Sequence, residues 1–92
     1  MEPLQHTATV AMRSLLDGQP TSPAKIAFAW RLAAGPALGR AGDPNWSTDG
    51  TLRIRARDAT WRREIQHARP IVMERLTQLL GPGVVRQIVV EG

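Results

Sequence analysis

Alternating arginines between residues 51 and 57 are the side chains of this sequence best suited to chemistry. The run TLRIRAR places Arg53, Arg55 and Arg57 at every second position. Successive side chains of a strand point to opposite faces, so a strand here would carry three guanidinium groups on one face and apolar side chains on the other. A guanidinium group can pair with a phosphate through two hydrogen bonds, so the pattern indicates a surface for a polyanion.

The basic character extends beyond this strand. Six of the eleven arginines lie between residues 53 and 69, where only Asp58 and Glu64 offset them. The candidate nucleic-acid-binding residues are Arg53, Arg55, Arg57, Arg62, Arg63 and Arg69. The whole chain has a net charge of +4 and an isoelectric point near 11.4, which favours nucleic acid as a partner. The alternative is an ordinary solvated face in an arginine-rich protein.

Trp46 is a second candidate for binding, because it lies among polar residues on a weakly apolar segment. An exposed tryptophan can stack on a base or anchor a protein partner. The alternative is a tryptophan that folds back over the edge of a sheet. Trp30 and Trp61 lie instead on periodic apolar faces, which predicts that they belong to the core.

No catalytic or metal-binding set of residues is recognisable. His6 and His67 are far apart, neither has a ligand-type neighbour at metal-binding spacing, and there is no cysteine. Gly39-Arg40-Ala41-Gly42 matches the GxxG loop of nucleic-acid-binding KH domains, but that loop joins two helices, whereas this one precedes an expected hairpin. We interpret it as a chance match and expect a protein that is not an enzyme, with no metal, cofactor or small-molecule substrate. The apolar runs are also too short to span a bilayer, so we expect no membrane segment.

Two helices are expected in the first part of the chain. Residues 4–16 form a candidate helix that ends at Asp17-Gly18. Ser22 followed by Pro23 is a strong start signal for a second helix, which Gly35-Pro36 should kink or end. Its expected inner face contains Ile26, Trp30, Ala33 and Ala37, with Phe28 and Leu32 left to pack against the first helix.

The remaining elements are three strands and one long helix. A tight turn at Asp49-Gly50 should join a weak edge strand within residues 40–48 to a strand over 51–57. Residues 59–80 have the clearest helical period, with Asp58 or Thr60 as the cap and with a kink, or a junction of two helices, at Pro70. Residues 84–90 should form a last strand, central in the sheet because both of its faces are apolar.

This order of elements, α-α-β-β-α-β, predicts an α+β fold of two layers. A three-stranded sheet would be covered by helices on one face, and its arginine face would be open to water. We expect residues 1–92 to form one domain, with residues 1–21 as an N-terminal helix and linker within it.

An ordered set of features resembles the DciA family, over about residues 12–90. The features are Trp30, Gly35, Asp49-Gly50, Leu52-Arg53-Ile54-Arg55, Trp61, Ile65, Leu79-Leu80-Gly81 and Val84-Val85-Arg86-Gln87-Ile88. The resemblance implies a KH-like fold without a working GxxG loop and a bacterial, cytoplasmic protein, with nucleoid association as an option. It also implies a non-enzymatic role, without a cofactor, at the initiation of replication: binding the replicative helicase and DNA and assisting the loading of the helicase.

Two other functions remain open at this point. The chain could be a stand-alone module for single-stranded DNA or RNA, or a structural domain that dimerises through a strand edge. Many members of the family add a basic, disordered extension, whereas this sequence ends at Gly92 directly after the expected last strand. If the protein lacks that extension, we expect a reduced binding module instead of a complete helicase loader.

Overall fold

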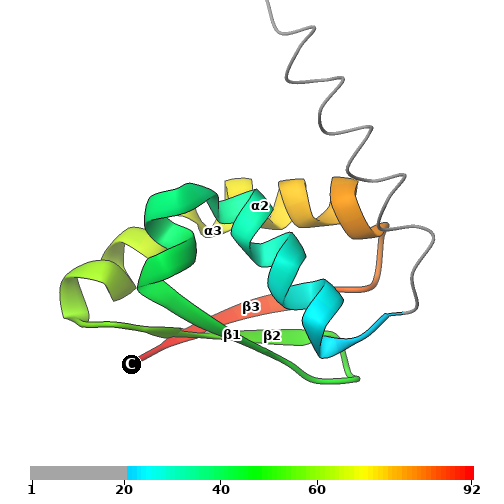
Figure 1. Cartoon of the computed structure of the whole chain (residues 1–92), viewed down its shortest axis with the longest axis horizontal. Coiled ribbons are helices and arrows are strands. Elements are labelled where there is room, and N and C mark those ends of the chain that lie inside the picture. The colour runs from blue at the N-terminus through cyan, green and yellow to red at the C-terminus, as the bar shows by residue number, and fades with distance from the viewer. Residues whose placement is uncertain (1–20) are drawn as a thin grey trace, which may run out of the picture.

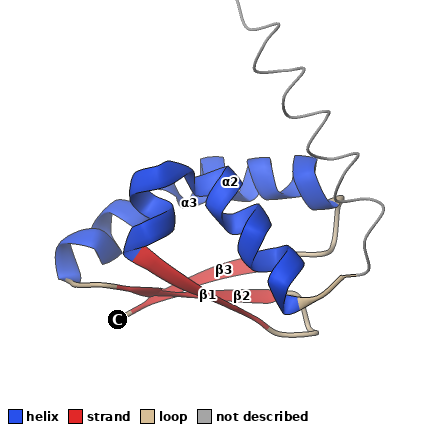
Figure 2. Ribbon diagram, viewed as in Figure 1, coloured by secondary structure: helices blue, strands red, loops and turns tan. Residues whose placement is uncertain are grey.

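Two helices pack on one face of a three-stranded sheet in the computed structural model, which describes residues 21–92 (Figures 1 and 2). The elements are α2 (Pro23–Ala41), β1 (Gly42–Trp46), β2 (Thr51–Ala56), α3 (Ala59–Leu80) and β3 (Gln87–Glu91). The expected α+β architecture is therefore confirmed for this part of the chain. The expected helix over residues 4–16 and its linker lie outside the described residues.

Helix α2 begins as the sequence predicts. The Ser22 hydroxyl oxygen accepts a hydrogen bond of 3.2 Å from the backbone N–H of Lys25, and proline occupies the first turn. The helical backbone is interrupted at Gly35, whose φ of 87° is one that other residues rarely adopt. The expected kink at Gly35-Pro36 is therefore confirmed.

The interruption at Gly35 changes which side chains face the core. Ile26, Trp30 and Ala33 are buried as expected, but Ala37 is exposed and Leu38 is packed against the core instead. The helical period is not continuous across the break, so extrapolating it to Ala37 was wrong.

The hairpin between β1 and β2 is tight and antiparallel. Trp46 pairs with Leu52, and Ser47 and Thr51 close the loop through a 2.9 Å bond from Ser47 N–H to Thr51 C=O. Gly50 has a φ of 92° and donates its N–H to Ser47 C=O. A glycine with positive φ at the end of a three-residue loop is a common hairpin geometry. The expected Asp-Gly turn is confirmed, as is the position of β1 at the edge of the sheet.

Asp49 holds this turn through its carboxylate. Its Oδ1 accepts a bond of 2.9 Å from Thr51 N–H, and the bonds from Thr51 lower the pKa of Asp49 below its ordinary value of 3.8. A carboxyl group with a lowered folded-state pKa contributes stability above its unfolded pKa and loses that contribution as pH falls through the folded pKa.

We therefore expect Asp49→Asn to lower the melting temperature near neutral pH but not in acid. The asparagine keeps an acceptor oxygen, so the difference from the wild type reports the charge of Asp49. Thermal unfolding followed by circular dichroism should show a lower melting temperature for the variant than for the wild type at about pH 6, and no such difference at about pH 2. A difference in melting temperature of the same size at both pH values would contradict this role of the charge.

Strand β3 differs from the prediction. It begins at Gln87 and runs parallel to β2 at the edge of the sheet, in the order β1-β2-β3, so the expectation that it is central was wrong. Val84 and Val85 precede the strand and pack against the core from the loop. The apolar run therefore reflects a buried loop joined to an edge strand, and not a strand buried on both faces.

Helix α3 is one element from Ala59 to Leu80, with Pro70 inside it. The alternative of two separate helices meeting near residue 69 is wrong, whereas the kink at Pro70 stays a prediction. Asp58 is the cap, because its Oδ1 accepts a bond of 2.9 Å from Trp61 N–H. Among the described residues, α3 and α2 together cover the inner face of the sheet, where Leu52 and Ile54 are fully buried.

Candidate nucleic-acid interface

The face of the sheet that no described helix covers, called here the open face, carries Arg53 and Arg55 in exposed positions on β2. The strand register sets their neighbours. Asn45 and Val89 lie beside Arg53, whereas Asp43 and Glu91 lie beside Arg55. Directly opposed side chains on neighbouring strands are close enough to interact. Arg55 therefore lies between two acidic residues in the sheet, an arrangement that the linear sequence does not indicate.

Arg57 lies beyond the end of β2 and contacts the C-terminal end of α2. Its Nη2 donates a bond of 3.0 Å to the backbone oxygen of Arg40, and its backbone N–H donates one of 2.8 Å to Ala41 C=O. The last carbonyl groups of a helix have no partner within the helix and carry the negative end of its dipole. Arg57 satisfies two of them, so it stabilises the junction of α2 and β1 as well as carrying charge.

Arg62 and Arg63 are exposed near the start of α3, directly after the end of β2. The first turn of α3 contains no acidic residue. The N-terminal end of a helix carries a partial positive charge, so the two guanidinium groups add to a field that already favours anions. They lie close to Arg57 along the chain, because β2 ends at Ala56 and α3 begins at Ala59.

Arg69 is separate from the other candidates. Its Nη1 donates to the backbone oxygen of Ile88 over 3.4 Å, a contact between α3 and β3. The backbone N–H of Gln87 points toward β2, because it donates to Gly50 C=O. The backbone groups of successive strand residues point to opposite sides, so the carbonyl of Ile88 points away from β2, to the outer side of β3. Arg69 therefore covers part of an exposed strand edge, and the six arginines do not form one continuous row.

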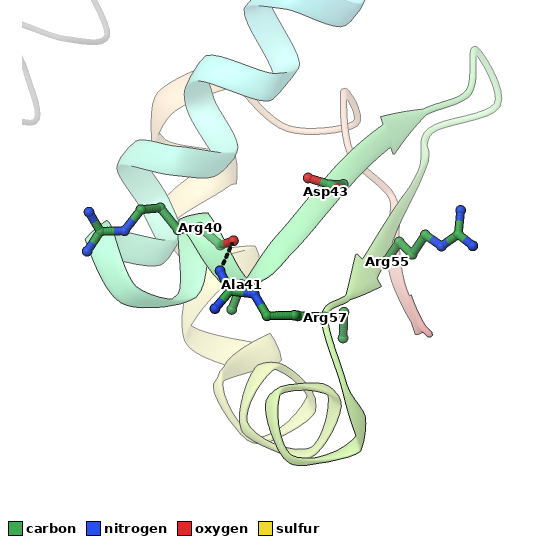
Figure 3. A pocket seen from close by; sticks show the side chains of 6 residues that line it. Arg40, Ala41, Asp43, Arg55 and Arg57 are labelled. Atoms are coloured by element: carbon green, nitrogen blue, oxygen red, sulfur yellow. Dashed lines mark hydrogen bonds between the residues drawn. The ribbon is translucent and has the colours of Figure 1, made fainter.

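Arg40 joins the candidates, although it is not among the arginines that the sequence pattern indicates. It is exposed in the last turn of α2 and lines an open hollow of about 250 Å³ at the end of the hairpin (Figure 3). The hollow, called here the rim hollow, is lined by Arg40, Ala41, Asp43, Arg55, Ala56 and Arg57. The signal in the sequence was weak, because Arg40 stands alone between glycine and alanine in the GxxG match.

Trp46 is half-buried and lies on the covered side of β1. Its ring N–H donates a bond of 3.2 Å to Val84 C=O, and its ring packs against the core. This is the geometry of a tryptophan folded back over the sheet, the alternative to an exposed anchor. A role of Trp46 in partner binding stays a prediction.

Trp46→Ala is expected to lower the free energy of unfolding by about 2 kcal/mol, because it removes partly buried ring area and the only bond described for its ring N–H. Trp46→Phe keeps most of the packing and should cost about half as much. Urea denaturation of both variants measures the difference. Equal stability of Trp46→Ala and the wild type would restore the interpretation of a free, exposed ring.

Residues 21–92 contain no group of three or more histidine or acidic side chains placed to hold a metal ion. Neither α2 nor α3 is long and apolar enough to cross a membrane.

A family model described as "Dna[CI] antecedent, DciA" matches residues 7–90, which is nearly the whole chain. No curated protein and no solved structure matches the chain significantly.

Proposed function

The chain belongs to the DciA family, and from this membership we propose that it is a non-enzymatic replication adaptor that binds the replicative helicase and DNA and assists the loading of the helicase onto DNA. The observation that carries the proposal is the match to the family over residues 7–90. DciA proteins have a role related to helicase loading and are not known as enzymes. The element order and the single covered face of the sheet support a KH-like fold.

The DNA-binding part of the proposal is supported by the exposed arginines at one end and on the open face of the sheet. The phosphate contacts are assigned to Arg53, Arg55, Arg57, Arg62 and Arg63, and with less support to Arg69, which is bonded to Ile88 C=O. Contacts of this kind are sensitive to salt and largely independent of sequence. The protein would act in the bacterial cytoplasm, where its DNA is found.

The test is a pull-down of the purified protein with the replicative helicase of the same organism. It is carried out with and without single-stranded DNA, at two salt concentrations. Capture of the helicase without DNA is the expected result. Salt-dependent DNA binding without capture would replace the proposal with a stand-alone nucleic-acid module. Self-association with neither partner bound would replace it with a structural dimer.

A further inference from the structure

The rim hollow brings together two segments of the chain, residues 40–43 and residues 55–57, which belong to three elements. Arg40 comes from the end of α2, Asp43 from β1, and Arg55 and Arg57 from β2 and the residue after it. The hollow is open to solvent and lies between the end of α2, the start of β1 and the end of β2, where its lining residues are drawn in Figure 3. Its lining residues include three arginines and one aspartate, so the surface around it has a net positive charge.

Arg57 is the fixed member of this group. Its backbone and its Nη2 are both bonded to the end of α2, which sets the direction of the side chain. An arginine has five N–H donors, and the contact with Arg40 C=O uses Nη2. Its guanidinium group is therefore held in place beside the hollow, with most of its donors left for a further partner.

Arg40 and Arg55 extend away from the hollow to opposite sides, with Arg57 between them in the view of Figure 3. This divergence does not suit one small anion, which would meet Arg57 and also the repulsive Asp43. A chain of phosphates suits it, because a nucleic-acid strand carries one charge for each 3.4 Å or so of its axis and can meet several guanidinium groups in turn.

We propose that a nucleic-acid phosphodiester backbone crosses the rim hollow along Arg40, Arg57 and Arg55, and that Asp43 limits its affinity. This inference rests on the DNA-binding part of the proposed function and adds Arg40 and Asp43 to it. The partner class is nucleic acid, recognised through its phosphates. An acidic protein surface is the competing occupant, which the experiment distinguishes.

Arg40→Gln is the decisive variant, because Arg57 bonds to the backbone oxygen of Arg40 and not to its side chain. The substitution therefore removes one guanidinium group and leaves the junction of α2 and β1 in place. The matched control is Arg86→Gln, which makes the same change of charge before β3, where the side chain packs against Gly50 at the opposite end of β2. Melting temperatures confirm that both variants are folded.

Fluorescence anisotropy with labelled single-stranded DNA, duplex DNA and RNA of equal length measures affinity at several salt concentrations. Arg40→Gln should weaken binding about two- to fivefold, as expected for one exposed charge pair. It should also make the slope of log affinity against log salt concentration less steep by about 0.7–0.9. Arg86→Gln should change affinity less than twofold. The three labelled ligands show which nucleic acid is preferred.

Asp43→Asn provides the opposite test, because it removes the one carboxylate of the hollow. It should raise affinity about two- to fivefold, whereas Glu74→Gln on α3, with the same change of net charge, should not. Equal effects of Asp43→Asn and Glu74→Gln would overturn the proposal, since binding would then follow net charge alone. Equal losses for Arg40→Gln and Arg86→Gln would overturn it in the same way.

Capture of the helicase without nucleic acid is measured on the same variants. If Arg40→Gln weakens capture and leaves DNA and RNA affinity unchanged, the proposal is overturned and the hollow belongs to a protein interface. If the wild type captures the helicase but binds no nucleic acid, this proposal fails and the helicase-binding part of the proposed function stands. If the wild type neither captures the helicase nor binds nucleic acid, both this proposal and the proposed function are refuted.

Discussion

Trp30→Ala is expected to lower the free energy of unfolding by about 3–5 kcal/mol, a large share of the 5–15 kcal/mol typical of a single domain. Trp30 is the largest fully buried side chain among the described residues, with no exposed surface. Its ring N–H donates a bond of 3.1 Å to Gly42 C=O, at the point where α2 passes into β1. The substitution removes the core packing of the indole and leaves that buried carbonyl without this donor.

Two companion variants separate these contributions. Trp30→Phe keeps an aromatic ring in the core but loses the bond to Gly42, so it should be intermediate in stability. Trp61→Ala removes a half-buried indole, so it should lower the free energy of unfolding clearly less than Trp30→Ala does. Urea denaturation monitored by circular dichroism gives all three values. A loss for Trp30→Ala no greater than that for Trp61→Ala would contradict the central place of Trp30 in the core.

Elements with local signals could be predicted from the sequence. Alternation in β2 predicted that Leu52 and Ile54 are buried and that Arg53 and Arg55 are exposed, because the period of a strand is a property of the backbone itself. The long period of α3 and the cap at Asp58 were also correct. In each case the local structure is determined by residues that lie within four positions of one another along the chain.

Features that depend on strand pairing could not be predicted in the same way. The flanking of Arg55 by Asp43 and Glu91 needs both registers of β2, and those registers are set by the whole sheet. The edge position of β3 depends on how the loop after α3 returns to Gly50, where Arg86 N–H bonds to the Gly50 carbonyl. The alternation of arginines therefore predicted a uniformly basic face, whereas in the sheet Arg55 lies between Asp43 and Glu91.

Gly42 illustrates a requirement that is invisible in the sequence. Its backbone is extended, so its conformation alone would allow any residue. A Cβ atom there would lie 2.5 Å from Ile54 Cγ2 and 3.0 Å from Ile65 Cδ1. The last glycine of the GxxG match is thus explained by close packing at the point where the chain passes from α2 into β1.

The double variant Arg53→Gln/Arg55→Gln is expected to reduce the salt dependence of DNA binding strongly. If each arginine meets one phosphate of duplex DNA, the slope of log affinity against log salt should fall by about 1.8. Over a fourfold rise in salt, the wild type would then lose about tenfold more affinity than the variant. Glutamine is preferred to glutamate because a third carboxylate beside Asp43 and Glu91 would destabilise the sheet.

The control is the double variant Arg31→Gln/Arg86→Gln, which makes the same change of net charge on α2 and in the loop before β3. Arg57 is left unchanged in both, because its bond to Arg40 C=O would confound stability with binding. Titrations at several salt concentrations give the slopes. Equal slopes for the two double variants would mean that the arginines of the open face act only through net charge, as an ordinary solvated face does. A smaller slope for Arg53→Gln/Arg55→Gln alone would mean that a nucleic acid lies across the open face, because only direct contact removes counterions from specific phosphates.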